Sequence, residues 1–190
     1  MVVAGLFILT ACGSGTNATE GYTTDPSTDP ATITFVEAPG TEDTCPITSV
    51  TLPPEGVASG FTLPKNDAII YLNQNMADAL AILGSPIGVH ETPSCAFDGI
   101  DRIFGFPGLQ IHTYPIREQD FIQIIRFTDD SIRTSEGIFL GSSWSNVLAA
   151  YGNDYVQDFD WFTFRRGYTS LTFVVRDGTV MEILYELIMS

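Results

Sequence analysis

The chain has 190 residues, with 23 acidic and 8 basic side chains and a formal net charge of −15. Such an acidic surface repels phosphate backbones and anionic lipid headgroups, so we expect no nucleic-acid partner and no membrane binding driven by charge. The hydrophobic fraction of 44%, which includes 13 Phe, 7 Tyr and 2 Trp, is ample for a packed core.

The N-terminus carries a short apolar run, residues 2–9, which is followed by Thr10, Ala11 and Cys12. The run is too short to span a bilayer, and an aliphatic residue and two small residues before a cysteine resemble a bacterial lipobox. We therefore predict that residues 1–12 are a lipoprotein signal peptide and that Cys12 carries the lipid anchor. The alternative is an ordinary secretory cleavage site beside an unrelated cysteine. Because no Lys or Arg precedes the apolar run, we expect the natural start to lie upstream of Met1.

Residues 13–45 are rich in Thr, Pro, Gly and acidic side chains. A segment of this composition buries too little apolar surface to offset the entropy of ordering it, so we predict a disordered tether. As a coil it would average roughly 30 Å from end to end, enough to hold a folded body away from the membrane.

Beyond Cys12 the chain has one further pair of cysteines, Cys45 and Cys95. In an oxidising extracellular setting an even pair favours a disulfide, and closing this loop would add about 4 kcal/mol of stability in the chain-entropy model. The alternative is a buried Cys95 and a free Cys45. The sequence leaves both open.

The folded region is predicted to begin with an extended segment that is interrupted by prolines, followed by a short strand at residues 68–72. Met76, Leu80 and Leu83 then follow at helical spacing. A second helix contains Val147, Leu148 and Tyr151 on one side. Both helices carry cap signals: Asn73 or Asn75 before the first and Gly84 after it, and Ser142 or Ser143 before the second and Gly152 after it.

Each predicted helix is followed by strand-like segments. After the first helix, residues 101–106 and 109–114 are predicted to form a hairpin, and residues 121–127 a third strand. After the second, strands are expected at residues 161–165, 171–175 and 180–187, and Asp177-Gly178 between two of them is a strong hairpin signal.

The pattern Leu80-Ala-Ile-Leu-Gly84 matches Leu148-Ala-Ala-Tyr-Gly152, which suggests two copies of one unit. We therefore predict an α+β fold of two tandem helix-then-antiparallel-sheet repeats behind the disordered tether. The first repeat, with its entry segment, is placed at residues 46–132 and the second at residues 133–190.

A short capped helix that begins with Gly141-Ser142-Ser143, ends in Ala150-Tyr151-Gly152 and precedes a strand meander resembles the β-lactamase-inhibitor-like fold, which also occurs singly in a small lipoprotein of the outer-membrane assembly machinery. The first copy keeps only the end of this motif. The resemblance implies protein–protein recognition on the concave face between two sheets. Four further phrases resemble uncharacterised surface lipoproteins of clostridia and their relatives, over about residues 65 to 190: Pro93-Ser-Cys-Ala-Phe-Asp-Gly99, Ile111-His-Thr-Tyr-Pro115, Phe127-Thr-Asp-Asp-Ser131 and Ser135-Glu-Gly-Ile138.

Catalytic and metal-binding patterns are weak. A Cys95–His112 nucleophile pair is conceivable, but no local spacing supports it and a disulfide at Cys95 would abolish it. Two histidines, His90 and His112, at unrelated spacing do not predict a zinc site, and no calcium-loop pattern is present. We therefore expect neither an enzyme nor a cofactor or metal.

Aromatic residues are dense in the C-terminal third, and Arg165-Arg166 is a basic pair in an acidic chain. Such residues either pack in the core and across strands or form a binding face. If they form a binding face, the predicted partner-binding residues are Trp144, Trp161, Phe162, Arg165, Arg166 and Tyr168. The sequence thus favours a non-catalytic protein-binding module, lipid-anchored on the outside of a bacterial, Gram-positive cell membrane, whose partner is an envelope or secreted protein. The alternative is a lipoprotein that binds a small ligand or a cell-wall glycan.

Overall fold

The structure is a computed structural model and describes residues 32–34, 49–51, 60–65 and 67–189. Cys12 and Cys45 lie outside these residues, so the lipid anchor and the Cys45–Cys95 disulfide stay predictions. Two three-residue strands, β1 (Thr32–Thr34) and β2 (Ser49–Thr51), pair antiparallel. β1 falls within the stretch whose composition predicts a disordered tether.

A second small sheet leads into the body of the protein. It consists of β3 (Thr62–Lys65) and β4 (Ala68–Tyr71), which pair antiparallel. The side chains of Leu63 and Ile70 face each other in this pair and are both fully buried. The predicted short strand at residues 68–72 is therefore confirmed to within one residue.

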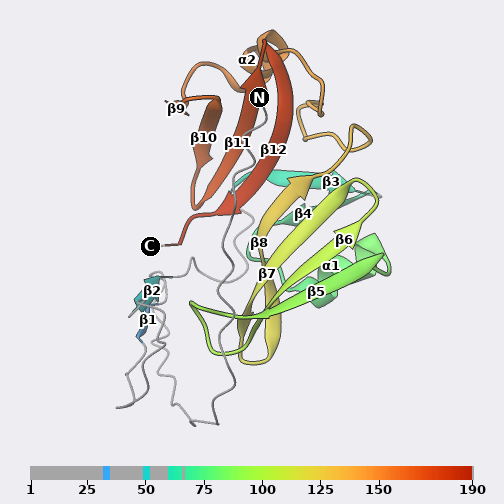
Figure 1. Cartoon of the computed structure of the whole chain (residues 1–190), viewed down its shortest axis with the longest axis vertical. Helices are drawn as coiled ribbons and strands as arrows, with labels where there is room; N and C mark the ends of the chain where they lie inside the picture. The colour runs from blue at the N-terminus through green and yellow to red at the C-terminus, as the bar shows by residue number, and fades with distance from the viewer. Residues whose placement is uncertain (1–31, 35–48, 52–59, 66, 190) are drawn as a thin grey trace, which may run out of the picture.

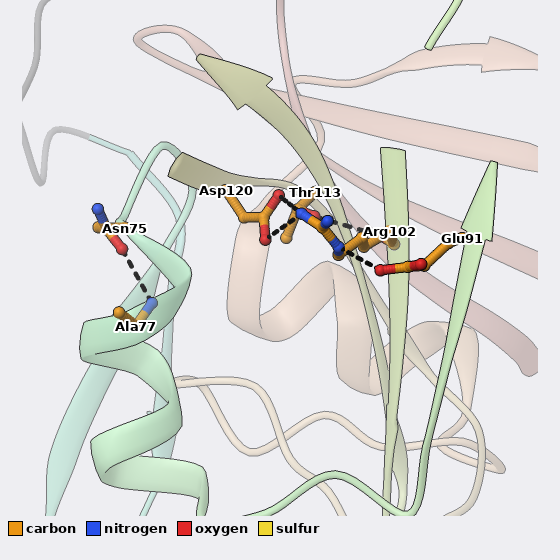
Figure 2. Close-up of polar contacts among 6 residues, drawn as sticks. All are labelled: Asn75, Ala77, Glu91, Arg102, Thr113 and Asp120. Carbon is orange, nitrogen blue, oxygen red and sulfur yellow. Dashed lines mark hydrogen bonds and ion pairs between the residues drawn. The ribbon is translucent and has the colours of Figure 1, made fainter. Parts of the chain in front are cut away.

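Both predicted helices are present, and each has eight residues: α1 (Met76–Leu83) and α2 (Trp144–Tyr151). Asn75 caps α1, because its Oδ1 accepts a 2.9 Å hydrogen bond from the backbone N–H of Ala77 (Figure 2). Ser143 caps α2 in the same way through the N–H of Asn146. Each helix ends at a glycine with φ of +80°, Gly84 and Gly152, as predicted.

The remaining strands form one antiparallel sheet of eight, in the order β5-β6-β7-β8-β12-β11-β10-β9 (Figure 1). Each half of the order is a meander of strands that are consecutive in sequence. The strands are β5 (Gly88–Pro93), β6 (Ile100–Phe106), β7 (Leu109–Ile116), β8 (Gln119–Phe127), β9 (Val156–Asp158), β10 (Trp161–Arg166), β11 (Thr169–Arg176) and β12 (Thr179–Leu187).

The predicted α+β fold of two tandem helix-then-sheet repeats is wrong. The described residues are mostly β: their two helices are short, and the eight strands from β5 to β12 join into a single sheet through the pairing of β8 with β12. In that pairing Ile124, Ile125 and Arg126 lie opposite Glu186, Tyr185 and Leu184. Two separate four-stranded sheets would leave the backbone N–H and C=O groups of β8 and β12 unpaired at their edges. Joining the strands satisfies these groups, but nothing in the local pattern of either strand reveals the partner.

One face of the sheet carries the core. Successive cross-strand partners on this face form an apolar row over six strands, and all of them are buried: Phe104, Ile111, Ile125, Tyr185, Leu171 and Phe164. Met76 of α1 and Val147 of α2 belong to the same buried cluster. Both helices therefore pack on this face. We call the opposite side of the sheet the far face.

Candidate partner-binding surface

Trp144 and Phe162 belong to an aromatic cluster on the helix-covered face. Their ring centroids lie 4.3 Å apart, and the ring of Trp144 also meets Tyr155 edge-on at 5.5 Å. Both side chains are partly buried and pack against the core. The structure therefore gives these two predicted partner-binding residues a packing role between α2 and β10.

Arg165, Arg166 and Tyr168 lie at the end of β10 that is distant from Trp161. The guanidinium of Arg166 stacks over the ring of Phe61, 4.5 Å from its centroid. Tyr168, in the turn between β10 and β11, is 42% exposed. At about 3.4 Å per residue, the length of β10 separates Trp161 from Arg166 by about 17 Å. The six predicted residues therefore do not form one patch.

Three exposed apolar side chains of the C-terminal half, including the two most exposed, Phe159 and Val156, lie instead on the hairpin formed by β9 and β10. Val156 is 61% exposed, Phe159 is 88% exposed and Trp161 is 46% exposed. We call these three residues the apolar tip. Val156 pairs with Thr163 and Trp161 pairs with Asp158, so strand alternation places Val156 and Trp161 together on the far face.

Phe159 has an unusual backbone conformation as well as an exposed side chain. It occupies the turn between β9 and β10 with φ of +50°. The left-handed region is rare for bulky residues and is normally occupied by Gly, Asn or Asp. A phenylalanine here packs on little of its own protein and is also held in an unfavourable conformation.

Acidic side chains surround the apolar tip. All of them are exposed: Asp154, Asp158, Asp160 and Asp177. Asp177 lies in the β11–β12 turn, which is next to the hairpin because the carbonyl of Asp160 accepts a 2.8 Å hydrogen bond from the N–H of Val175. The one cation in this group is Arg176, whose Nε lies 3.4 Å from Asp160. Four acids against one base leave the surroundings of the tip at a formal charge of −3.

The far face carries a row of five polar side chains and two isoleucines across the centre of the sheet. Its members are successive cross-strand partners on seven strands: His90, Ile103, His112, Ile124, Glu186, Ser170 and Arg165. Burial raises the pKa of Glu186. Burial, and then the charge of Arg126, lowers the pKa of His112. Ile124 separates His112 from Glu186 in the row, so these two groups do not converge on one point.

A second polar cluster links β5, β6 and β8 (Figure 2). Arg102 Nε lies 2.7 Å from Glu91 Oε1, and its Nη1 lies 2.8 Å and 2.9 Å from the two carboxylate oxygens of Asp120. The side chain of Asp120 is 18% exposed and that of Glu91 is 58% exposed. Both carboxylates are paired with the one guanidinium, and these contacts hold three strands together.

Cys95 lies in the loop after β5 and is exposed, whereas His112 is half-buried within β7. Among the residues that the structure describes, no group of three His, Cys, Asp or Glu side chains could hold a metal ion. No helix in the same part of the chain is both long enough and apolar enough to cross a membrane.

Comparison of the chain with protein families, curated proteins and solved structures gives no match. The resemblance of its motifs to clostridial surface lipoproteins therefore stays a prediction.

The predicted partner-binding set does not include Val156 and Phe159, although Phe159 is one of the dense aromatic residues of the C-terminal third. β9 has only three residues, too few for a strand alternation to be recognised, and aromatic density alone does not separate core from surface. One signal was present: Phe159 lies between Asp158 and Asp160 in a turn, where a residue that packs inward is not expected.

Proposed function

We propose that this protein is a lipid-anchored, extracellular, non-catalytic module that binds another envelope or secreted protein through its apolar tip. The observation that carries the proposal is Phe159, which is 88% exposed in the turn of an edge hairpin and has a positive φ. Cys12 would supply the membrane anchor, and residues 13–45 the reach from the membrane.

The conformation of Phe159 has a cost to folding that its contacts do not offset. A left-handed conformation costs an L-residue roughly 1–2 kcal/mol, and Gly or Asn would avoid most of this cost. Exposed apolar surface on the free protein adds no stability. A residue that is unfavourable in both respects is best explained by a bound state in which its ring is buried, since backbone strain of this kind concentrates at ligand contacts.

The residues of the apolar tip and the acidic side chains around it suit a protein partner. Aromatic side chains that are buried at the centre of an interface contribute most of its binding energy, and surrounding polar groups exclude water. Phe159 and Trp161 would be such anchors, with the exposed aspartates as the rim. The two-residue turn of the hairpin limits the entropy that is lost when the tip becomes ordered in a complex.

Site-specific photocrosslinking in the source cells tests this function. p-Benzoylphenylalanine replaces Phe159 in the full-length protein, and Ile69, which is 55% exposed on β4, carries the same group in a matched control. We expect one dominant covalent adduct with an envelope or secreted protein from position 159 and none from position 69. Identical adducts from both positions, or no protein adduct from position 159, would count against the proposal. Adducts with cell-wall glycan only would favour the glycan-binding alternative.

A further inference from the structure

We infer that the partner contributes an extended, basic and apolar segment that adds to the β9 edge of the sheet as a further strand. This inference rests on the proposed function, because it uses the same surface, and it adds the chemistry and the conformation of what is bound.

The edge itself supplies the first argument. β9 is the last strand in the order of the eight-stranded sheet, so it has no strand neighbour on its outer side among the residues that the structure describes. All three of its residues are exposed. A strand edge of this kind is a template for pairing, and an extended peptide that adds to it gains backbone hydrogen bonds.

The charge around the edge selects the occupant. The four exposed aspartates and Arg176 leave this end of the sheet at −3, and residues 152–164 contain no Lys or Arg. An acidic or phosphorylated segment would be repelled, whereas Lys or Arg side chains would be attracted and steered toward the edge. The same charge disfavours pairing between two copies of this chain through β9.

Strand geometry predicts the spacing of the bound residues. Val156 and Asp158 are two residues apart on β9, and their side chains share the far face. On an added strand, the positions opposite them are also two residues apart. The bound segment should therefore present an apolar residue beside Val156, one intervening residue, and a Lys or Arg beside Asp158, whose cross-strand neighbour on β10 is Trp161. The order of the two depends on whether the added strand is parallel or antiparallel.

A random dodecapeptide library displayed on phage tests the inference, with the full chain immobilised. Counter-selection uses the double variant Phe159→Ala, Trp161→Ala, and Ile69→Ala is the matched surface control. We expect enriched peptides with an apolar residue and a basic residue separated by one position, bound at least about tenfold more tightly by the wild type than by the double variant.

Three measurements on an enriched peptide then define the mode of binding. Asp158→Asn should weaken binding about fivefold, whereas Asp98→Asn, which removes an exposed charge elsewhere, should change it less than twofold. Raising NaCl from about 50 to about 300 mM should weaken binding several-fold, because screening shortens the range of the attraction. N-methylation of alternate backbone amides of the peptide should abolish binding in one of the two alternations only, because only one set of amides faces β9.

Three outcomes would overturn this inference and leave the proposed function standing. The enriched peptides could depend on the tip but be neutral, they could bind Asp158→Asn and wild type equally, or they could tolerate N-methylation in both alternations. A library that yields no tip-dependent peptide would overturn it too. Failure of the proposed function is read separately, from the absence of a protein adduct at position 159 in cells.

Discussion

The backbone N–H of Phe61 donates a 2.9 Å hydrogen bond to Oγ1 of Thr169, which lies 108 residues further along the chain. The approach is so close that a Cβ at Gly60 would overlap the Thr169 side chain. The ring of Phe61 also packs edge-on against Tyr151 and Tyr185. Gly60 and Phe61, which directly precede β3, therefore pack against the C-terminal half of the sheet.

Thr169→Val should lower the free energy of unfolding by about 1–3 kcal/mol. Valine keeps the shape of the side chain but leaves the buried N–H of Phe61 without its acceptor. Urea denaturation gives the value, and Thr169→Ser is the control, because serine keeps the hydroxyl and should lose less. Equal losses for serine and valine would show that the methyl group of Thr169 contributes as much as its hydrogen bond to Phe61, contrary to this expectation.

Local elements of this fold were predictable because each carries its own signal. Both helices begin and end at the predicted cap residues, and the strands from β6 to β8 and from β10 to β12 lie where apolar alternation and turn residues place them. β5 was missed, since its sequence lacks apolar alternation and ends at Pro93. The joining of β8 to β12 was also missed, because strand pairing between segments some sixty residues apart has no local signature.

The candidate site was less predictable than the fold. An aromatic-rich sequence identifies the region but not the side on which each ring lies. Trp161 and Phe162 are neighbours in sequence, yet alternation places Trp161 on the far face and Phe162 in the cluster under α2. Phe159 is exposed because it lies in the turn that follows β9. β9 has only three residues, so its alternation, and with it the turn, cannot be recognised in the sequence.

Phe159→Asn should raise the free energy of unfolding by a few tenths to about 1 kcal/mol, because asparagine tolerates a positive φ better than phenylalanine. Thermal or urea unfolding of the full chain measures the change. Tyr168→Asn is the matched control, since it also removes an exposed ring but at a position without a positive φ, and should stay within about 0.5 kcal/mol of wild type. A destabilised Phe159→Asn would mean that the ring makes stabilising contacts in the free protein.

Arg102→Met should destabilise the protein by about 1–3 kcal/mol, because it leaves the partly buried Asp120 carboxylate without its two hydrogen bonds. Glu91→Gln removes the more exposed partner and should cost no more than about 0.5 kcal/mol. Urea denaturation of both variants at pH 7 makes the comparison. If Glu91→Gln costs as much as Arg102→Met, the exposed Arg102–Glu91 ion pair contributes more to stability than the Arg102–Asp120 pair.

His112 should make stability depend on pH in a direction that follows from its environment. Burial among β-strands, and then the positive charge of Arg126, lowers the pKa of His112 in the folded state below its ordinary value of 6.5. Between these two pKa values the unfolded chain binds more protons than the folded protein, so stability rises with pH. This contribution is complete above pH 6.5 and is lost as the pH falls toward the folded-state pKa.

His112→Gln should remove this dependence. The unfolding free energy of wild type minus that of the variant should therefore increase as the pH rises from 5 to 7.5. The prediction concerns this increase and not the value of the difference at either pH. Buried acids such as Glu186, whose raised pKa acts in the opposite sense, are present in both proteins and cancel in the difference. Urea denaturation at four or five pH values measures it. A difference that is flat across this range would mean that His112 titrates in the folded protein as it does in the unfolded chain, and that the sheet does not desolvate it.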